Sequence, residues 1–148
     1  MHVDLDYVYD PDPAQQTQNI NRLIQRVYDM KISHVFLQAF ADPQGDGRIK
    51  ALYFPNRRLP VRADLFNFVS WQLQTRAGVK VFAWMPVLSF DLDPSLPRVQ
   101  RRDRQTGQLH EATEPYIRLS PWNPQLRQQL TDNYEDLARY SSFNRMLI

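Results

Sequence analysis

The chain has 148 residues and a formal net charge of +2, and 43% of its residues are hydrophobic and 23% charged. This composition supports one domain with an apolar core and excludes an intrinsically disordered chain. So small a net charge predicts no nucleic-acid partner, and the absence of cysteine excludes a disulfide framework.

The start of the chain predicts a strand followed by a helix. Residues 2–9 alternate between apolar and polar side chains, which predicts a strand with Asp4 and Asp6 on the same face. Asp12 suits an N-cap, and Pro13 suits the first helical turn after it. Apolar residues then recur at helical spacing, so we expect an amphipathic helix that ends near residue 31. These residues are Ile20, Leu23, Ile24, Val27 and Tyr28.

The middle of the chain repeats this order. Residues 33–41 are mostly apolar, which predicts a strand covered on both faces, and a long polar loop is expected over 42–62. A second helix is expected from about Asp64 to Gly78, because glycine suits a helix C-terminus, and residues 80–90 predict a third strand. The apolar side of this helix comprises Leu65, Phe68, Val69 and Leu73.

The last third of the chain begins with another long loop, over 91–120, with a hairpin tip expected at 104–108. Four of its arginines, Arg98, Arg101, Arg102 and Arg104, are interrupted by Asp103 and indicate a solvated loop rather than a site for a polyanion. Asn123 and Pro124 predict the start of a third helix, and a fourth strand begins at residue 143.

The order β-α-β-α-β-α-β predicts a parallel sheet, either open and doubly wound or closed as an eight-stranded barrel. The loops after the first two strands contain no glycine-rich phosphate-binding motif, which counts against a nucleotide-binding open sheet. We therefore favour the α/β fold of a partial (β/α)8 TIM-type barrel. A full barrel takes about 250 residues, so residues 1–148 are interpreted as a single fragment with the first three and a half β/α units.

Polar and aromatic side chains gather at the expected strand ends, where barrels carry their sites. Asp4 and Asp6 could share acid and base roles in glycoside cleavage, bind substrate, or bind loop amides or an arginine. Trp84 is the preferred platform for a sugar ring. The three histidines lack metal-ligand spacing, so we expect no metal and no cofactor.

Several long segments resemble one bacterial family. Residues 4–10, 32–47, 54–60, 71–94 and 134–138 closely resemble the C-terminal glycoside-hydrolase-type domain of poly-β-1,6-N-acetyl-D-glucosamine N-deacetylases of the PgaB/HmsF type. The resemblance covers nearly the whole chain. It implies a barrel that binds, and in some members cleaves, the partially de-N-acetylated β-1,6-linked glucosamine polymer of biofilms.

The resemblance also implies a periplasmic, outer-membrane-associated parent protein beside an export pore. The family's deacetylase domain is absent from this chain, and its catalytic acid is expected beyond Ile148. On its own the fragment is therefore expected to be inactive as a hydrolase. The alternative is a non-catalytic carbohydrate-binding module that guides the polymer to the pore. The residues expected to bind substrate are Asp4, Asp6, Tyr7, Gln38, Asp42 and Trp84.

Overall fold

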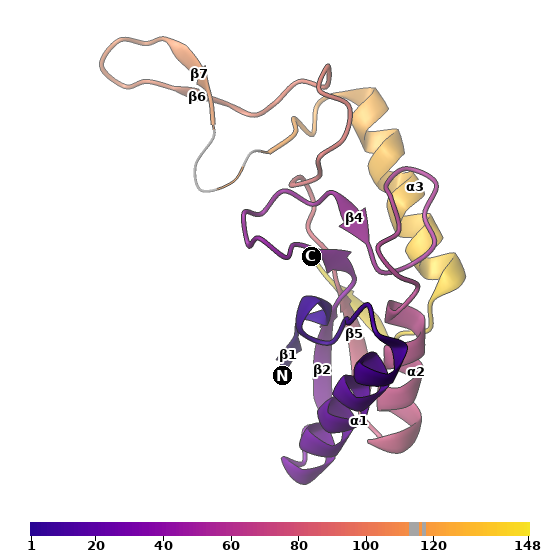
Figure 1. Cartoon of the computed structure of the whole chain (residues 1–148). Coiled ribbons are helices and arrows are strands. Elements are labelled where there is room, and N and C mark those ends of the chain that lie inside the picture. Colours follow the sequence, from indigo (N-terminus) through magenta and orange to yellow (C-terminus); the bar gives the residue numbers. More distant parts are fainter. Residues whose placement is uncertain (113–115, 117) are drawn as a thin grey trace.

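The centre of the fold is a parallel four-stranded sheet. The computed structural model describes residues 1–112, 116 and 118–148 (Figure 1). The strand order follows the chain order, unlike the reversed order of open doubly wound sheets. The strands are β1 (His2–Val3), β2 (His34–Gln38), β5 (Lys80–Trp84) and β8 (Arg145–Leu147), in this spatial order.

Three helices connect these strands: α1 (Pro13–Asp29), α2 (Phe66–Arg76) and α3 (Pro124–Tyr140). Two of their predicted starts are confirmed. The Asp12 side chain accepts a hydrogen bond from the Ala14 N–H at 3.0 Å, and the Asn123 side chain accepts one from the Leu126 N–H at 2.9 Å. Each cap satisfies an N–H that has no partner within the helix.

The two faces of the sheet differ. One face is covered by α1 and α2, and its side chains, such as Leu37 and Val81, are fully buried (Figure 1). The other face carries a layer of rings from three strands. The ring of Phe36 lies 4.9 Å from that of His2 and 5.3 Å from that of Phe82. This ring layer continues to Trp84 at the carboxyl end of β5, whose ring lies 5.4 Å from that of His2.

The expected strand over 2–9 is wrong beyond Val3. The Asp4 side chain accepts a hydrogen bond from the Asp6 N–H at 2.8 Å, which winds the chain into the short 3-10 helix η1 (Leu5–Tyr7). A local bond of this kind competes with strand pairing. Asp4 and Asp6 therefore do not share one face of a strand.

The expected polar loop over 42–62 is also wrong in part. It contains β4 (Ala51–Leu52), which pairs antiparallel with β3 (Phe40–Ala41). Tyr53 and Phe54, which follow, are fully buried. This loop therefore lies on the core rather than over the surface.

The second helix and third strand also differ from expectation. Phe68 is 48% exposed and does not belong to the buried side of α2, which Phe66, Val69 and Leu73 form instead. The strand expected over 80–90 ends at Trp84, before Pro86. Proline cannot donate a ladder hydrogen bond, so it limits the pairing of this strand.

The long loop after β5 contains the expected hairpin, formed by β6 (Gln100–Arg102) and β7 (Leu109–Glu111). It projects from the rest of the molecule (Figure 1), and every residue of its two strands is exposed. Asp103 holds the tip by accepting hydrogen bonds from the Gln105 and Thr106 N–H groups at 2.8 and 2.7 Å. The hairpin is thus a defined, solvated protrusion.

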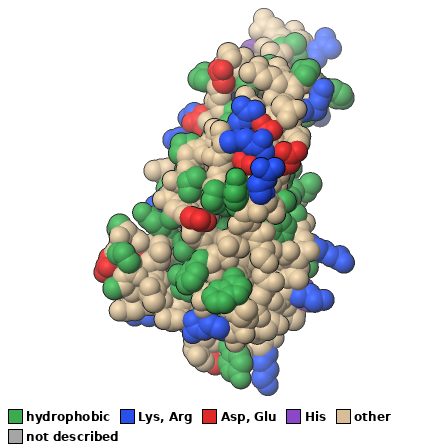
Figure 2. Space-filling model, turned by 90° about the vertical axis from the view of Figure 1, so that its right-hand side faces the viewer, with side chains coloured by type: hydrophobic (Ala, Val, Ile, Leu, Met, Phe, Trp, Pro, Cys, Tyr) green, Lys and Arg blue, Asp and Glu red, His purple; other side chains and the backbone are tan. Residues whose placement is uncertain are grey.

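Two arginines fasten the 42–62 loop to α3. The Arg57 Nε donates to Asp136 Oδ1 at 3.0 Å, and the Arg58 Nε donates to Asp132 Oδ2 at 2.6 Å. Both aspartates are 3% exposed. Figure 2 shows basic and acidic side chains gathered on the side of the molecule where α3 lies, and Glu135 adds a contact to Arg57 at 3.1 Å.

We expect Asp132→Asn to lower the melting temperature at pH 7 because it removes the charge that Arg58 pairs with. Hydrogen bonds from Arg58 and Gln128 lower the pKa of Asp132 from its ordinary value of 3.8. A lowered folded-state pKa contributes stability above pH 3.8 that is lost as the pH falls through the folded pKa. The difference between the melting curves of the two proteins should therefore shrink under strong acid. An equal difference at pH 7 and pH 2 would contradict this assignment.

Candidate functional site

The carboxyl ends of the strands meet around the carboxylate of Asp6. Its Oδ2 accepts hydrogen bonds from the Asp42 N–H at 2.7 Å and from Gln38 Nε2 at 3.1 Å. Its Oδ1 accepts bonds from Tyr53 Oη at 2.6 Å and from Arg62 Nη1 at 3.0 Å. The side chain is only 9% exposed. Asp6 thus holds together the end of β1, the end of β2 and the segment after β4.

Aromatic rings surround this carboxylate. The Arg62 guanidinium lies over the ring of Tyr9, 4.7 Å from its centroid, and that ring lies 6.2 Å from the ring of Tyr53. Burial raises the pKa of the Tyr53 hydroxyl well above its ordinary value, and the hydrogen bond to Asp6 raises it further. The raised pKa keeps the Tyr53 hydroxyl protonated at neutral pH, so it can donate to Asp6.

Two further carboxylates lie near Asp6. Burial raises the pKa of Asp4, and the negative charges of Asp6 and Asp42 raise it further, against the lowering effect of the Asp6 N–H. Asp42 accepts hydrogen bonds from the Asp46 N–H at 3.1 Å and the Gly47 N–H at 3.0 Å, which orders the loop after β3. The three carboxylates form an acidic cluster at this end of the sheet, which we call the acidic rim (Asp4, Asp6 and Asp42).

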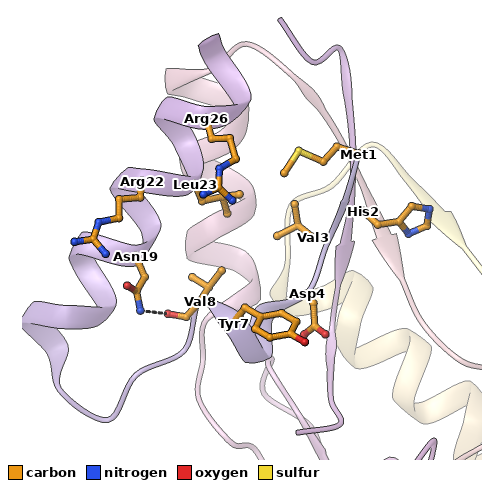
Figure 3. A pocket seen from close by; sticks show the side chains of 10 residues that line it. All are labelled: Met1, His2, Val3, Asp4, Tyr7, Val8, Asn19, Arg22, Leu23 and Arg26. Carbon is orange, nitrogen blue, oxygen red and sulfur yellow. Dashed lines mark hydrogen bonds between the residues drawn. The ribbon is translucent and has the colours of Figure 1, made fainter. Parts of the chain in front are cut away.

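Tyr7 lies on the outer side of this rim. Its side chain is 87% exposed, and with Asp4 it lines a pocket of about 350 Å³ between β1 and α1 (Figure 3). Arg22 and Arg26 line the same pocket from the helix. Asn19 fixes the chain after η1 by donating to the Val8 carbonyl at 3.3 Å.

Trp84 occupies the end of β5, directly beside Gln38 of β2. Its ring makes edge contacts with Phe40 at 5.3 Å and His2 at 5.4 Å between centroids. The side chain is half-buried. It therefore combines a fixed orientation with an accessible surface, as a stacking platform requires.

The structure brings some of the predicted site residues together and separates others. Asp6, Gln38 and Asp42 are joined by hydrogen bonds. Asp4 lies close enough for the charges of Asp6 and Asp42 to raise its pKa. Tyr7 lies in the pocket beside α1, whereas Trp84 contacts the ring layer. The six residues thus line two adjoining regions rather than a single cavity.

Sequence reasoning missed Tyr53 and Arg62, the two side-chain donors that bind Asp6 from the 42–62 loop. The signal was the apolar run Ala51–Phe54 within that loop, which indicates burial. Gly47 was also missed. It has φ +68°, and a Cβ there would overlap the ring of Tyr116. Only glycine lets this ring lie directly against the loop that Asp42 orders.

These residues present aromatic rings and polar groups at one end of the sheet. The oxygens of Asp6 are fully engaged by protein donors, so it positions its neighbours rather than acting on a substrate. In the part of the chain that the structure describes, no group of three or more His, Asp or Glu side chains is arranged to hold a metal ion. None of the described helices has the length and apolar content of a membrane span.

A parallel sheet in sequential order, with its polar and aromatic side chains at the carboxyl ends of the strands, defines an α/β protein of the TIM-barrel type. The comparison with solved structures agrees. The glycoside hydrolase domain of PgaB (BpsB) from Bordetella bronchiseptica superimposes with a TM-score of 0.88 and 51% sequence identity, over 100% of this chain and 42% of that chain.

The chain belongs to the family described as "Hypothetical glycosyl hydrolase family 13", which matches residues 2–148. It is 54% identical to the poly-beta-1,6-N-acetyl-D-glucosamine N-deacetylases of Escherichia coli strains K12 and O157:H7, over 99% of its length. It spans 22% of the length of these relatives. The resemblance to this family that the sequence motifs indicate is therefore confirmed.

We expect Tyr53→Phe to destabilise the protein by about 2 kcal/mol, because a buried carboxylate loses one of its donors. Tyr9→Phe is the matched control, since it removes a hydroxyl from the neighbouring ring that contacts Arg62 and keeps the ring itself. Urea unfolding of both variants would measure the difference. Equal stability of the two would show that the bond to Asp6 contributes nothing.

Asp4→Asn should stabilise the protein at neutral pH, since the asparagine side chain still offers an oxygen to the Asp6 N–H but carries no charge. Because the folded-state pKa of Asp4 is raised, the protonated side chain contributes stability to the wild type. This contribution is complete below pH 3.8 and is lost as the pH rises through the folded pKa. The gain in melting temperature should thus be present at pH 7 and vanish near pH 3. A variant that is less stable than the wild type at pH 7 would refute this.

Proposed function

We propose that this chain binds partially de-N-acetylated poly-β-1,6-N-acetyl-D-glucosamine, as part of a protein that processes this biofilm polysaccharide. The observation that carries the proposal is the position of Trp84 beside the acidic rim, in a chain 51% identical to a glycoside hydrolase domain. We further propose that its four parallel strands are one half of a (β/α)8 barrel.

The chemistry of the polymer fits the two kinds of side chain at this end of the sheet. Each sugar ring has an apolar face that can stack on an indole such as that of Trp84. De-N-acetylated units carry an ammonium group, which can pair with the carboxylate of Asp4, the rim carboxylate that lines an open pocket together with Arg22 and Arg26. Asp4 and Tyr7 would contact the polymer, whereas Asp6, Gln38 and Asp42 would hold the rim in shape, since their polar atoms bond to the protein.

Two roles are compatible with such a surface. Hydrolysis is supported by the family description and by the name of the structural relative. Binding without cleavage, which would guide the polymer toward an export pore in the outer membrane, is supported by the engagement of Asp6 with four protein donors. We propose binding as the activity of this chain and the periplasm as its location.

Trp84→Ala should reduce the affinity for the de-N-acetylated polymer about three- to tenfold, as expected for the loss of one stacking contact. Trp71→Ala is the matched control, because Trp71 is 52% exposed on α2, a helix on the face of the sheet opposite the ring layer. Isothermal titration calorimetry would give both affinities, and thermal melts would show that both variants remain folded.

Equal affinities for the two variants would refute a role of Trp84 in binding. Mass spectrometry of the same incubations separates the two roles. Release of short oligosaccharides would identify hydrolysis, whereas binding without release would identify a binding segment.

A further inference from the structure

A second hollow lies in the long segment after β5, at the base of the projecting hairpin. It has a volume of about 620 Å³, within the usual range for ligand pockets. Its polar and aromatic lining is provided by Arg98, Gln100, Arg118, Ser120 and Trp122. We propose that this pocket binds neutral, N-acetylated units of the polymer, an inference that rests on the proposed function.

The backbone around the pocket is held by hydrogen bonds. The Val99 N–H donates to the Arg118 carbonyl at 2.8 Å, and the Ser120 N–H donates to the Pro97 carbonyl at 2.8 Å. The Leu119 N–H donates to the Leu88 carbonyl at 3.0 Å, which ties this ladder to the segment directly after β5. The pocket therefore has a fixed frame at the carboxyl end of the sheet.

Trp122 gives the pocket an open stacking surface. The residue is 85% exposed, although it directly precedes Asn123, the ordered cap of α3. The Arg127 Nη1 donates to the Trp122 carbonyl at 3.1 Å, which holds the backbone at this position. The exposed face of this indole can receive the apolar face of a sugar ring.

The charge of the pocket is opposite to that of the acidic rim. Its lining includes the guanidinium groups of Arg98 and Arg118, and among the lining residues in the described part of the chain there is no carboxylate. The adjoining hairpin adds three further arginines and only two acids, Asp103 and Glu111. This surface repels a glucosamine ammonium, whereas the carbonyl of a neutral acetamido group can accept hydrogen bonds from a guanidinium.

The pocket and the rim are connected through the chain. Asp42 orders Gly47 by accepting a hydrogen bond from its N–H, and the ring of Tyr116 lies against Gly47. Tyr116 precedes Arg118 of the pocket by two residues. Both regions lie at the carboxyl end of the sheet, and we infer that a polymer long enough to span them contacts both. Its charged units would be drawn to the carboxylates and its acetylated units to the arginines, so that the acetylation pattern sets the preferred position of the chain.

The test uses two β-1,6-linked hexasaccharides, one fully N-acetylated and one fully de-N-acetylated, at about pH 6 so that the amines are protonated. Trp122→Ala should weaken binding of the acetylated hexamer at least threefold and change binding of the other less than twofold. Arg98→Glu should strengthen binding of the de-N-acetylated hexamer at least threefold. Trp71→Ala is again the control and should alter neither affinity.

The possible results are distinct. If the wild type binds neither hexamer, both the proposed function and this inference are refuted. If it binds but Trp122→Ala changes nothing, or changes both affinities equally, the polymer binds elsewhere or without discrimination, and only this inference fails. A decrease confined to the acetylated hexamer, together with the opposite change for Arg98→Glu, supports it.

Discussion

The hydrogen bonds to the carboxylate of Asp6 are the interaction on which the whole rim depends. A buried carboxylate is strongly unfavourable unless its oxygens have partners. Here the partners come from β2, from the loop after β3 and from the segment after β4, so the charge is satisfied only when these parts are assembled. The same bonds that stabilise Asp6 therefore fix the positions of the four groups that donate to it.

This arrangement separates the roles of residues that look alike in sequence. Asp4 and Asp6 are two positions apart, yet Asp6 is enclosed by donors while Asp4 lines an open pocket and has a raised pKa. The difference arises from η1, whose turn directs the two side chains into different surroundings. Of the pair, Asp4 is the carboxylate that a ligand can reach.

Much of the framework was predictable because it depends on local sequence. The starts of α1 and α3 follow from an Asp or Asn followed by proline, and the parallel order follows from the alternation of strands and helices. The rim was not predictable in the same way. Tyr53 and Arg62 reach Asp6 across 47 and 56 residues of chain, and no periodic pattern specifies such a contact. Likewise, the bond from the Asp6 N–H to Asp4 overrides an alternation that is typical of a strand.

Charged side chains are distributed unevenly over the carboxyl end of the sheet. Carboxylates gather where β1 and β2 end, whereas the pocket after β5 is lined by two arginines and, among the described residues, by no carboxylate. A polymer with uniform charge would be attracted at one end of this surface and repelled at the other. A partially de-N-acetylated polymer carries both charged and neutral units, so it can bind at both regions at once. The accessible carboxylate of Asp4 thus lies apart from the arginine-lined pocket, and we infer that this separation favours a ligand of mixed charge over either uniform form.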